Sequence, residues 1–204
     1  MNHINTLALS PLALLSLFAS AATPSFDCSK TSNDVEVLIC KDQGLANLDK
    51  EMATLYPKAI ANLSPEDRNS AKAQQRGWVK GRNECWKTQD MRNCIEYSYR
   101  LRISDLQINA GQLSVPNPVF YQCGKAVSLE TYIYKNAKIP VAVVNLNEGD
   151  DAPVQVRTYL QPDDSKQQRY EGENLTLVTM GNTAILQRFE HPDLTCQQAR
   201  GNIE

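Results

Sequence analysis

Six cysteines constrain the fold of this chain more than any other feature. They are Cys28, Cys40, Cys85, Cys94, Cys123 and Cys196. An even number of cysteines behind an export signal predicts disulfide bonds, here three. After the leader the chain has a single histidine, His191, which leaves little material for histidine-based catalysis. The pattern favours a disulfide-stapled, exported binding protein over an enzyme.

The first 22 residues have the pattern of a secretory signal peptide. An apolar stretch over residues 7–18 precedes Ala19-Ser20-Ala21-Ala22, and cleavage after Ala21 or Ala22 fits equally well. The alternative is a membrane anchor, but the apolar stretch is shorter than the roughly 20 residues of a spanning helix. Ser25-Phe26-Asp27 before Cys28 is not a lipobox, so we expect no lipid on that cysteine. We expect a periplasmic or secreted protein with no membrane span.

The distribution of charge argues against a nucleic acid as the partner. The whole chain carries a net charge of -2, with +1 over residues 23–110 and -3 over residues 111–204. A nucleic-acid-binding protein needs a clustered basic surface, which neither half supplies. The acidic second half suits a cationic partner.

The chain changes character near residue 111. Apolar residues recur every three or four positions before it, whereas afterwards they alternate or form short β-branched runs. The segment 111–118 contains two prolines and a glycine, which is typical of a linker. We predict an α+β protein of two domains. The predicted parts are a signal peptide (1–22), a helical domain (23–110), a linker (111–118) and a small antiparallel β-barrel or sandwich (119–204).

Three helices are predicted in the first half. Asn33 or Asp34 caps a first helix that runs to about Asn62, and Ser64-Pro65 begins a second helix. A third helix begins near Asp90. Three antiparallel helices form a small bundle, whose core is marginal below about 90 residues unless disulfides reinforce it.

The bundle geometry brings the four N-terminal cysteines to one end. Three pairings of four cysteines are possible. We favour Cys40–Cys85 with Cys28–Cys94, because both bonds join elements that are far apart in sequence. In the second half Cys123 pairs with Cys196, since no other cysteine lies between them.

The second half is predicted to be β throughout, with short strands separated by turn residues. The candidate strands are Val119–Cys123, Val127–Tyr134, Pro140–Asn145, Val154–Leu160, Gln167–Glu171, Leu175–Thr179 and Ala184–Phe189.

Sequence motifs for catalysis are missing. His191 lies in a loop-like segment, and one histidine with disulfide-bonded cysteines does not make a metal site. The chain has neither a glycine-rich phosphate loop nor a Gly-x-Ser-x-Gly elbow. The acidic pairs Asp150-Asp151 and Asp163-Asp164 lie in turn-like stretches, where solvated charge is the favoured interpretation. We expect no catalytic residue, no metal and no cofactor.

The stretch 74–86 (QQRGWVKGRNECW) concentrates two tryptophans, two arginines and a cysteine. We favour a structural interpretation, in which Trp78 packs over the disulfide end of the bundle. Arg82 then pairs with an acid of the first helix, such as Glu36 or Asp49. The alternative is a binding rim made of arginine and tryptophan.

Together with Cys28, the segment Glu36–Cys40 and the run Leu45–Asp49, this stretch resembles the N-terminal domain of the LprI family. The resemblance covers about residues 26–108. Some members of that family are lysozyme inhibitors, so the resemblance implies a helical fold and points to lysozyme inhibition.

Residues 164–184, with Phe120–Cys123 and Cys196, look like the MliC/PliC family of C-type lysozyme inhibitors. The resemblance covers about residues 119–198 and implies a small eight-stranded barrel with a disulfide bond. In that family a Ser-Gly-x-x-Tyr segment and a Lys-Gly-x-x-Ala segment form the inhibitory surface. The two segments place the expected partner contacts at Ser165, Lys166, Arg169, Tyr170, Met180 and Gly181.

This chain departs from the family pattern at one important position. Met180 stands where the family lysine should be, and Lys166 occupies the place of the serine in the other segment. A lysozyme cleft holds two catalytic carboxylates, one of them ionised, with which an ammonium group can pair. Our hypothesis is that Lys166 supplies the missing charge.

These observations predict an exported, non-enzymatic lysozyme inhibitor that occludes the active-site cleft of a C-type lysozyme. The alternative is a non-inhibitory binding or adaptor protein of the cell envelope, built on the same two domains. The sequence leaves the oligomeric state and the role of the helical domain open.

Overall fold

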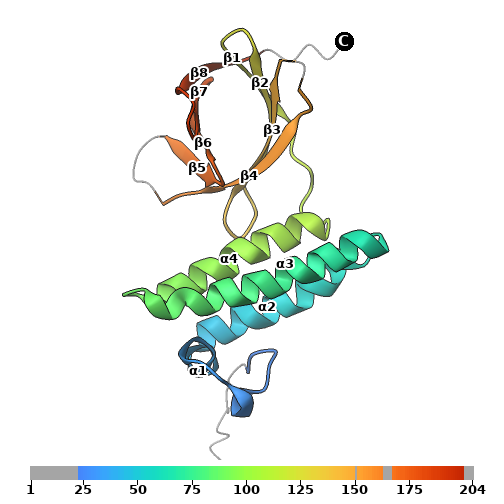
Figure 1. The fold of residues 1–204 in the computed structure, drawn as a ribbon, viewed down its shortest axis with the longest axis vertical. Coiled ribbons are helices and arrows are strands. Elements are labelled where there is room, and N and C mark those ends of the chain that lie inside the picture. The colour runs from blue at the N-terminus through green and yellow to red at the C-terminus, as the bar shows by residue number, and fades with distance from the viewer. Residues whose placement is uncertain (1–22, 150, 163–166, 200–204) are drawn as a thin grey trace, which may run out of the picture.

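A computed structural model of the protein describes residues 23–149, 151–162 and 167–199. The signal peptide predicted for residues 1–22 lies outside the described residues. The described part consists of helices followed by an eight-stranded antiparallel barrel, which confirms the predicted α+β class. Figure 1 shows the two parts one above the other, with the barrel strands arranged in a ring.

The helical part has four α-helices where the sequence predicted three. Two short 3-10 helices accompany them: η1 precedes α1, and η2 lies between α3 and α4. The elements are η1 (Cys28–Lys30), α1 (Asp34–Lys41), α2 (Gln43–Ile60), α3 (Pro65–Asn83), η2 (Glu84–Lys87) and α4 (Met91–Asn109).

The expectation of one continuous first helix was wrong because Asp42 interrupts it. Asp42 has extended backbone angles, and its Oδ1 accepts a hydrogen bond from the Leu45 N–H at 2.9 Å. An aspartate that caps the next helix in this way favours a break over helix continuation. The other predicted start signals are confirmed, since Asn33, Ser64 and Asp90 each cap a helix through their side chains.

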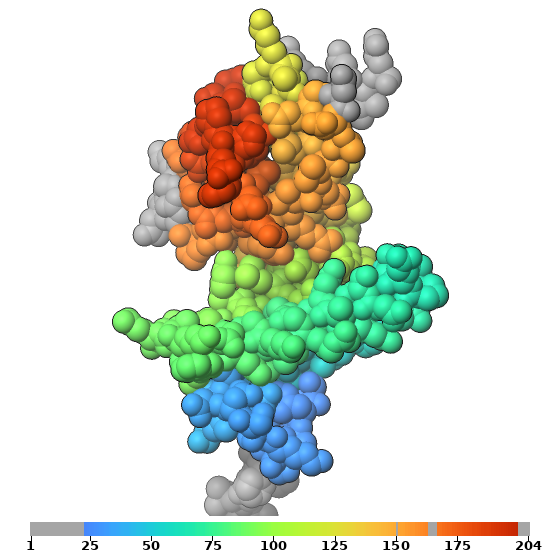
Figure 2. Space-filling view, viewed as in Figure 1, coloured from blue at the N-terminus to red at the C-terminus, as the bar shows by residue number. Residues whose placement is uncertain are grey.

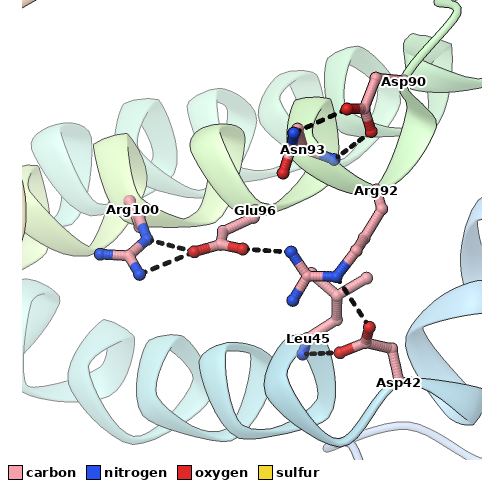
Figure 3. Close-up of polar contacts among 7 residues, drawn as sticks. All are labelled: Asp42, Leu45, Asp90, Arg92, Asn93, Glu96 and Arg100. Carbon is pink, nitrogen blue, oxygen red and sulfur yellow. Dashed lines mark hydrogen bonds and ion pairs between the residues drawn. The ribbon is translucent and has the colours of Figure 1, made fainter. Parts of the chain in front are cut away.

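Asp42 also ties the start of α2 to α4 through a chain of charged groups (Figure 3). Its Oδ2 accepts from Arg92 Nε at 2.9 Å, and Arg92 Nη1 donates to Glu96 at 2.5 Å. Arg100 Nε donates to the other oxygen of Glu96 at 2.8 Å. The hydrogen bond from Leu45 and the Arg92 guanidinium lower the pKa of Asp42, and Arg92 and Arg100 lower the pKa of Glu96.

The disulfides of the helical part correct the pairing that we favoured. Cys28 pairs with Cys40 and Cys85 pairs with Cys94, so Cys40–Cys85 and Cys28–Cys94 were wrong. The break at Asp42 makes α1 a separate short helix, against which η1 packs closely. Residues 88–90 alone join η2 to α4, so Cys85 and Cys94 are also close together in sequence. Each bond therefore closes a tight local turn instead of joining distant helices.

The barrel contains one strand more than the residue pattern predicted. Its strands are β1 (Val119–Cys123), β2 (Val127–Tyr134), β3 (Val141–Glu148), β4 (Val154–Leu160), β5 (Gln168–Gly172), β6 (Leu175–Met180), β7 (Thr183–Arg188) and β8 (Leu194–Gln198).

Strand β8 closes the barrel between β7 and β1. Its sequence, LTCQQ, is too short and too polar for a periodicity argument, although the resemblance to MliC/PliC implied eight strands. Cys123 and Cys196 face each other directly across β1 and β8 and form a disulfide, as predicted.

Strand β3 is buried on both of its faces and joins the two parts of the protein. Ala142 and Val144 belong to the barrel core, whereas Val141 and Val143 pack outside it with Tyr132, Tyr134 and Tyr159. Ile108 of α4 and Leu113 of the connecting segment pack against the same outer cluster. An almost continuous apolar run is typical of a strand that is covered on two sides.

Helix α4 lies directly beside the barrel (Figures 1 and 2), and polar contacts fix it there. Ser104 Oγ accepts from the Ile139 N–H at 2.8 Å and donates to the Ile139 carbonyl at 3.0 Å. Asp105 accepts from Arg157 Nη1 at 3.2 Å and from the Tyr159 hydroxyl at 2.8 Å. Burial and the Asp105 charge together raise the pKa of Tyr159.

Candidate functional site

Three residues of the tryptophan-rich stretch, Trp78, Arg82 and Cys85, are buried in the helical part or pack against its core. Arg82 is 4 % exposed, and its Nη1 donates to the Tyr99 hydroxyl at 2.7 Å, which in turn donates to Asp49 Oδ1 at 2.8 Å. Trp78 lies edge-to-face against Tyr99 and donates its indole N–H to the Ser98 carbonyl at 3.3 Å. The structural interpretation of Trp78 and Arg82 is thereby confirmed.

Arg82 reaches both acids that the sequence suggested, one of them indirectly. Its Nη2 lies 3.9 Å from Glu36 Oε1, and it reaches Asp49 through the Tyr99 hydroxyl. Asp49, which is 2 % exposed, also accepts from the Ser25 N–H at 2.5 Å. The network therefore connects α1, α2, α3, α4 and the segment that leads into η1.

One tryptophan of the same stretch remains on the surface. Trp86 is 59 % exposed in η2, beside the Cys85–Cys94 bond, and the Lys87 ammonium lies 5.5 Å from its ring centre. An exposed tryptophan next to a cation is the kind of group that anchors protein contacts. Trp86 is the exposed large apolar side chain of the stretch.

The first barrel segment expected to contact a partner is only partly described. Ser165 and Lys166 lie outside the described residues. Arg169 is half-buried, and its guanidinium donates hydrogen bonds to Glu171 at 2.5 Å and to Gln187 at 3.1 Å. Tyr170 is 1 % exposed and belongs to the barrel core, so its side chain supports the segment instead of facing outward.

The second segment forms the turn between β6 and β7. Met180 ends β6, and Gly181 has φ +58°, a backbone conformation that favours glycine. Gln168 pairs with Thr179 across β5 and β6, so both expected segments meet at one end of the barrel. Thr183 Oγ donates to the Met180 carbonyl at 3.0 Å and holds the turn.

That end of the barrel contains a cavity of ≈ 330 Å³, the mouth cavity. It is lined by Val119, Tyr121, Ile133, Lys135, Gln168, Thr179, Gly181 and Gln198. Lys135 also lines a second hollow of ≈ 600 Å³ under the connecting segment, where Val115 is 72 % exposed. Sequence reasoning missed Lys135, because only the barrel register brings the end of β2 beside the Gly181 turn.

Metal and membrane sites find no support in the described residues. Within them, no group of three histidine, cysteine, aspartate or glutamate side chains is placed to hold a metal ion. His191 lies in the exposed turn between β7 and β8. No helix of the described part is long and apolar enough to cross a bilayer.

Comparison with known proteins supports the first of the two family resemblances. Residues 27–106 match a family model described as "Lysozyme inhibitor LprI". Lipoprotein LprI of Mycobacterium bovis and of Mycobacterium tuberculosis are each 33% identical to this chain over 104 residues. The match covers 50% of this chain and 50% of each relative, so the chain spans about half the length of the curated relatives it matches.

No solved structure matches the chain. The likeness of the barrel to MliC/PliC therefore stays a prediction that rests on its residues. The helical part, over residues 27–106, is the region in which this chain is similar to LprI.

Proposed function

We propose that the protein is an exported, non-enzymatic inhibitor of a lysozyme, with a C-type lysozyme as its first candidate partner. The match of residues 27–106 to the lysozyme inhibitor LprI model carries this proposal. The disulfide bonds and the expected signal peptide support a periplasmic or secreted location, where such a partner is met.

The mouth cavity gives the proposal a mechanism of cleft occlusion. An ammonium group presented at the end of a rigid barrel can pair with an ionised carboxylate in the lysozyme cleft. Lys135 is an exposed lysine that lines the same cavity as Gly181 and Gln168. It takes over the role of the family lysine whose place Met180 occupies, with Lys166 as a second source of charge.

The test is titration of the oxidised, mature, full-length protein against a C-type lysozyme that is lysing cell walls. We expect inhibition, and we expect Lys135→Ala to weaken it at least about tenfold, because a desolvated interfacial charge contact is lost. Lys72→Ala, an exposed lysine on α3, is the matched control and keeps full inhibition. Met180→Lys strengthens inhibition if the turn faces the cleft.

Trp86→Ala decides whether the helical part makes the contact instead. If Trp86→Ala loses inhibition while Lys135→Ala keeps it, the inhibitory surface lies on η2 and the barrel mechanism is wrong. If the wild type and every variant are folded but none inhibits the lysozyme, the inhibitor proposal is wrong for that type of lysozyme.

The second candidate is a non-inhibitory binding or adaptor protein of the cell envelope. Two observations favour it: Met180 occupies the lysine position, and the Tyr170 side chain is buried. Capture of an envelope component by the mature protein, with no inhibition of any lysozyme tested, supports this function.

A further inference from the structure

Strand β4 leaves part of one edge unpaired in the described barrel. It pairs with β3 from Val154 to Tyr159, but with β5 only over residues 158–160. Among the described residues, residues 154–157 are therefore paired with a strand on one side alone, that of β3. Since backbone groups alternate in direction along a strand, part of the N–H and C=O groups of these residues point away from β3.

The pairing between β4 and β5 ends at Gly172. A Cβ atom at Gly172 would come within 2.4 Å of the Arg157 carbonyl oxygen, so the two strands are in very close contact there. Beyond Gly172 the chain turns through Glu173 and Asn174 into β6. The turn leaves the free half of β4 without a partner strand.

A cleft of ≈ 690 Å³ lies along this free edge. Leu146, Val156 and Leu175, which pack against or belong to the barrel core, contribute to its lining. Val154 and Phe189 also line it and are 56 % and 68 % exposed. Exposed apolar side chains beside an open strand edge are typical of a surface that a partner covers.

Two turn residues at the cleft have an unfavourable backbone conformation, and one buried side-chain nitrogen in its lining lacks a hydrogen-bond acceptor. Asn174, which lines it, and Glu190, beside Phe189, have φ of 56° and 60°; they are the described non-glycine residues with positive φ. Arg188 has a side chain that is 10 % exposed and donates from Nη1 to Glu148 at 2.5 Å. Its Nε is buried without an acceptor among the described residues. Such features cluster at ligand sites.

The uncompensated charge around the cleft is negative. The two arginines of its lining are already paired, Arg188 with Glu148 and Arg157 with Asp105. Glu173 in the lining and Glu190 in the adjoining turn are exposed carboxylates. A basic occupant complements this rim.

We propose that the free edge of β4, residues 154–157, binds an extended segment of a partner protein by strand addition, with basic and apolar side chains alternating along that segment. Main-chain hydrogen bonds to β4 supply affinity. Alternate side chains of the added strand meet the apolar pair Val154 and Phe189 and the acidic rim. The site lies at the end of the barrel opposite the mouth cavity, so it is independent of the proposed inhibitory surface.

The probe is a fluorescent peptide of alternating lysine and valine, about ten residues long so that it covers a strand. Its binding to the mature, oxidised, full-length protein is measured by fluorescence anisotropy and mapped by amide chemical shifts. Two comparison peptides have the same length: one alternates glutamate and valine, and the other keeps the lysines but replaces the valines by proline, which cannot donate to a strand.

We expect saturable binding of the lysine-valine peptide, with shifts centred on residues 154–157, and at least tenfold weaker binding of both comparison peptides. Val154→Lys weakens binding at least about tenfold, because it removes an apolar contact and adds a like charge. Val115→Lys changes another exposed valine, on the connecting segment and outside the cleft, and leaves the affinity unchanged.

Equal binding of the proline peptide would show that charge alone attracts the probe and would overturn strand addition. Shifts that centre elsewhere, no saturable binding, or an unaltered affinity of Val154→Lys would each overturn the site. Whether or not the peptide binds, we expect Val154→Lys to inhibit lysozyme to the same extent as the wild type. This test is therefore separate from the test of the proposed function.

Discussion

The disulfides of the helical part and of the barrel differ greatly in the number of residues that they span. Cys28–Cys40 and Cys85–Cys94 span 12 and 9 residues, whereas Cys123–Cys196 spans 73. In the loop-entropy account, the short bonds stabilise by roughly 3 kcal/mol each and the long bond by roughly 4–5 kcal/mol. The helical bonds fix local turns, while the barrel bond fixes the closure of the whole sheet.

The two cores differ in chemistry as well. The helical core contains the buried Asp49, Arg82 and Tyr99, joined by hydrogen bonds. The polar residues buried in the barrel are uncharged threonines. A barrel obtains its register from a continuous ladder of backbone bonds, whereas a small helical bundle has no such ladder between helices. A buried polar network is one way for helices to specify a single arrangement.

Removal of the barrel disulfide tests the first difference and carries the largest expected effect. Cys123→Ala with Cys196→Ala lowers the free energy of unfolding by about 4 kcal/mol, because the open loop is long. Cys28→Ala with Cys40→Ala lowers it by about 3 kcal/mol. Urea unfolding of both double variants measures the difference. Equal losses would contradict loop length as the cause.

Asp49→Ala tests the second difference, with a loss of about 3 kcal/mol. The substitution leaves the buried Tyr99 hydroxyl and the Ser25 N–H without their acceptor, which costs far more than an exposed charge contact. Asp151→Ala, an exposed aspartate before β4, is the control and changes stability by less than about 0.5 kcal/mol. A loss below about 1 kcal/mol for Asp49→Ala would mean that water replaces the network.

Asp105→Ala tests how far the two parts act as one unit. It removes the acceptor of Arg157 and Tyr159 on α4, so we expect a loss of about 1–2 kcal/mol. Both tryptophans lie in the helical part, so their fluorescence reports on that part alone, whereas far-ultraviolet circular dichroism reports on both. We expect the two transitions to coincide in the wild type and to separate in the variant. In Asp105→Asn, which keeps one acceptor oxygen, we expect the two transitions to lie closer together than in Asp105→Ala.

The sequence predicted the elements well where one local signal decides the outcome. Ser64-Pro65 begins α3 and Asp90 begins α4, because helix caps act within one turn. Cys123–Cys196 followed from elimination. The break at Asp42 was also local, but an aspartate inside an apolar periodicity suits a helix surface equally well. The favoured disulfides failed because they assumed a helix that continues through this residue.

The candidate site was less predictable, because it depends on contacts between distant residues. Lys135 and Gly181 share the mouth cavity only through the barrel register. Tyr170 follows the family tyrosine in sequence, yet period-two alternation in β5 turns it inward. The contact of α4 with β3 had one sequence signal, the continuous run Val141–Val144, which is buried on both faces.

The charged chain between α2 and α4 gives the smallest expected effect and a definite pH dependence. The pKa values of Asp42 and Glu96 are lowered in the folded protein, so their contribution to stability is present above their unfolded values of about 4. It disappears as the pH falls through the folded values. Arg92 is 44 % exposed and its ion pairs are screened by solvent, so we expect Arg92→Met to cause only a small loss of stability at pH 7.

The pH profile separates this contribution from a loss of packing. Because the ion pairs vanish when the carboxylates are protonated, the stabilities of wild type and Arg92→Met converge as the pH falls through the lowered pKa values of Asp42 and Glu96. Arg76→Met, an exposed arginine on α3, gives a curve parallel to the wild type at every pH. Unfolding by urea between pH 2 and 7 provides both comparisons, within the usual carboxylate range of about 2 to 5. A gap between wild type and Arg92→Met that persists in acid would assign the effect of Arg92 to packing of its aliphatic stem and not to its charge.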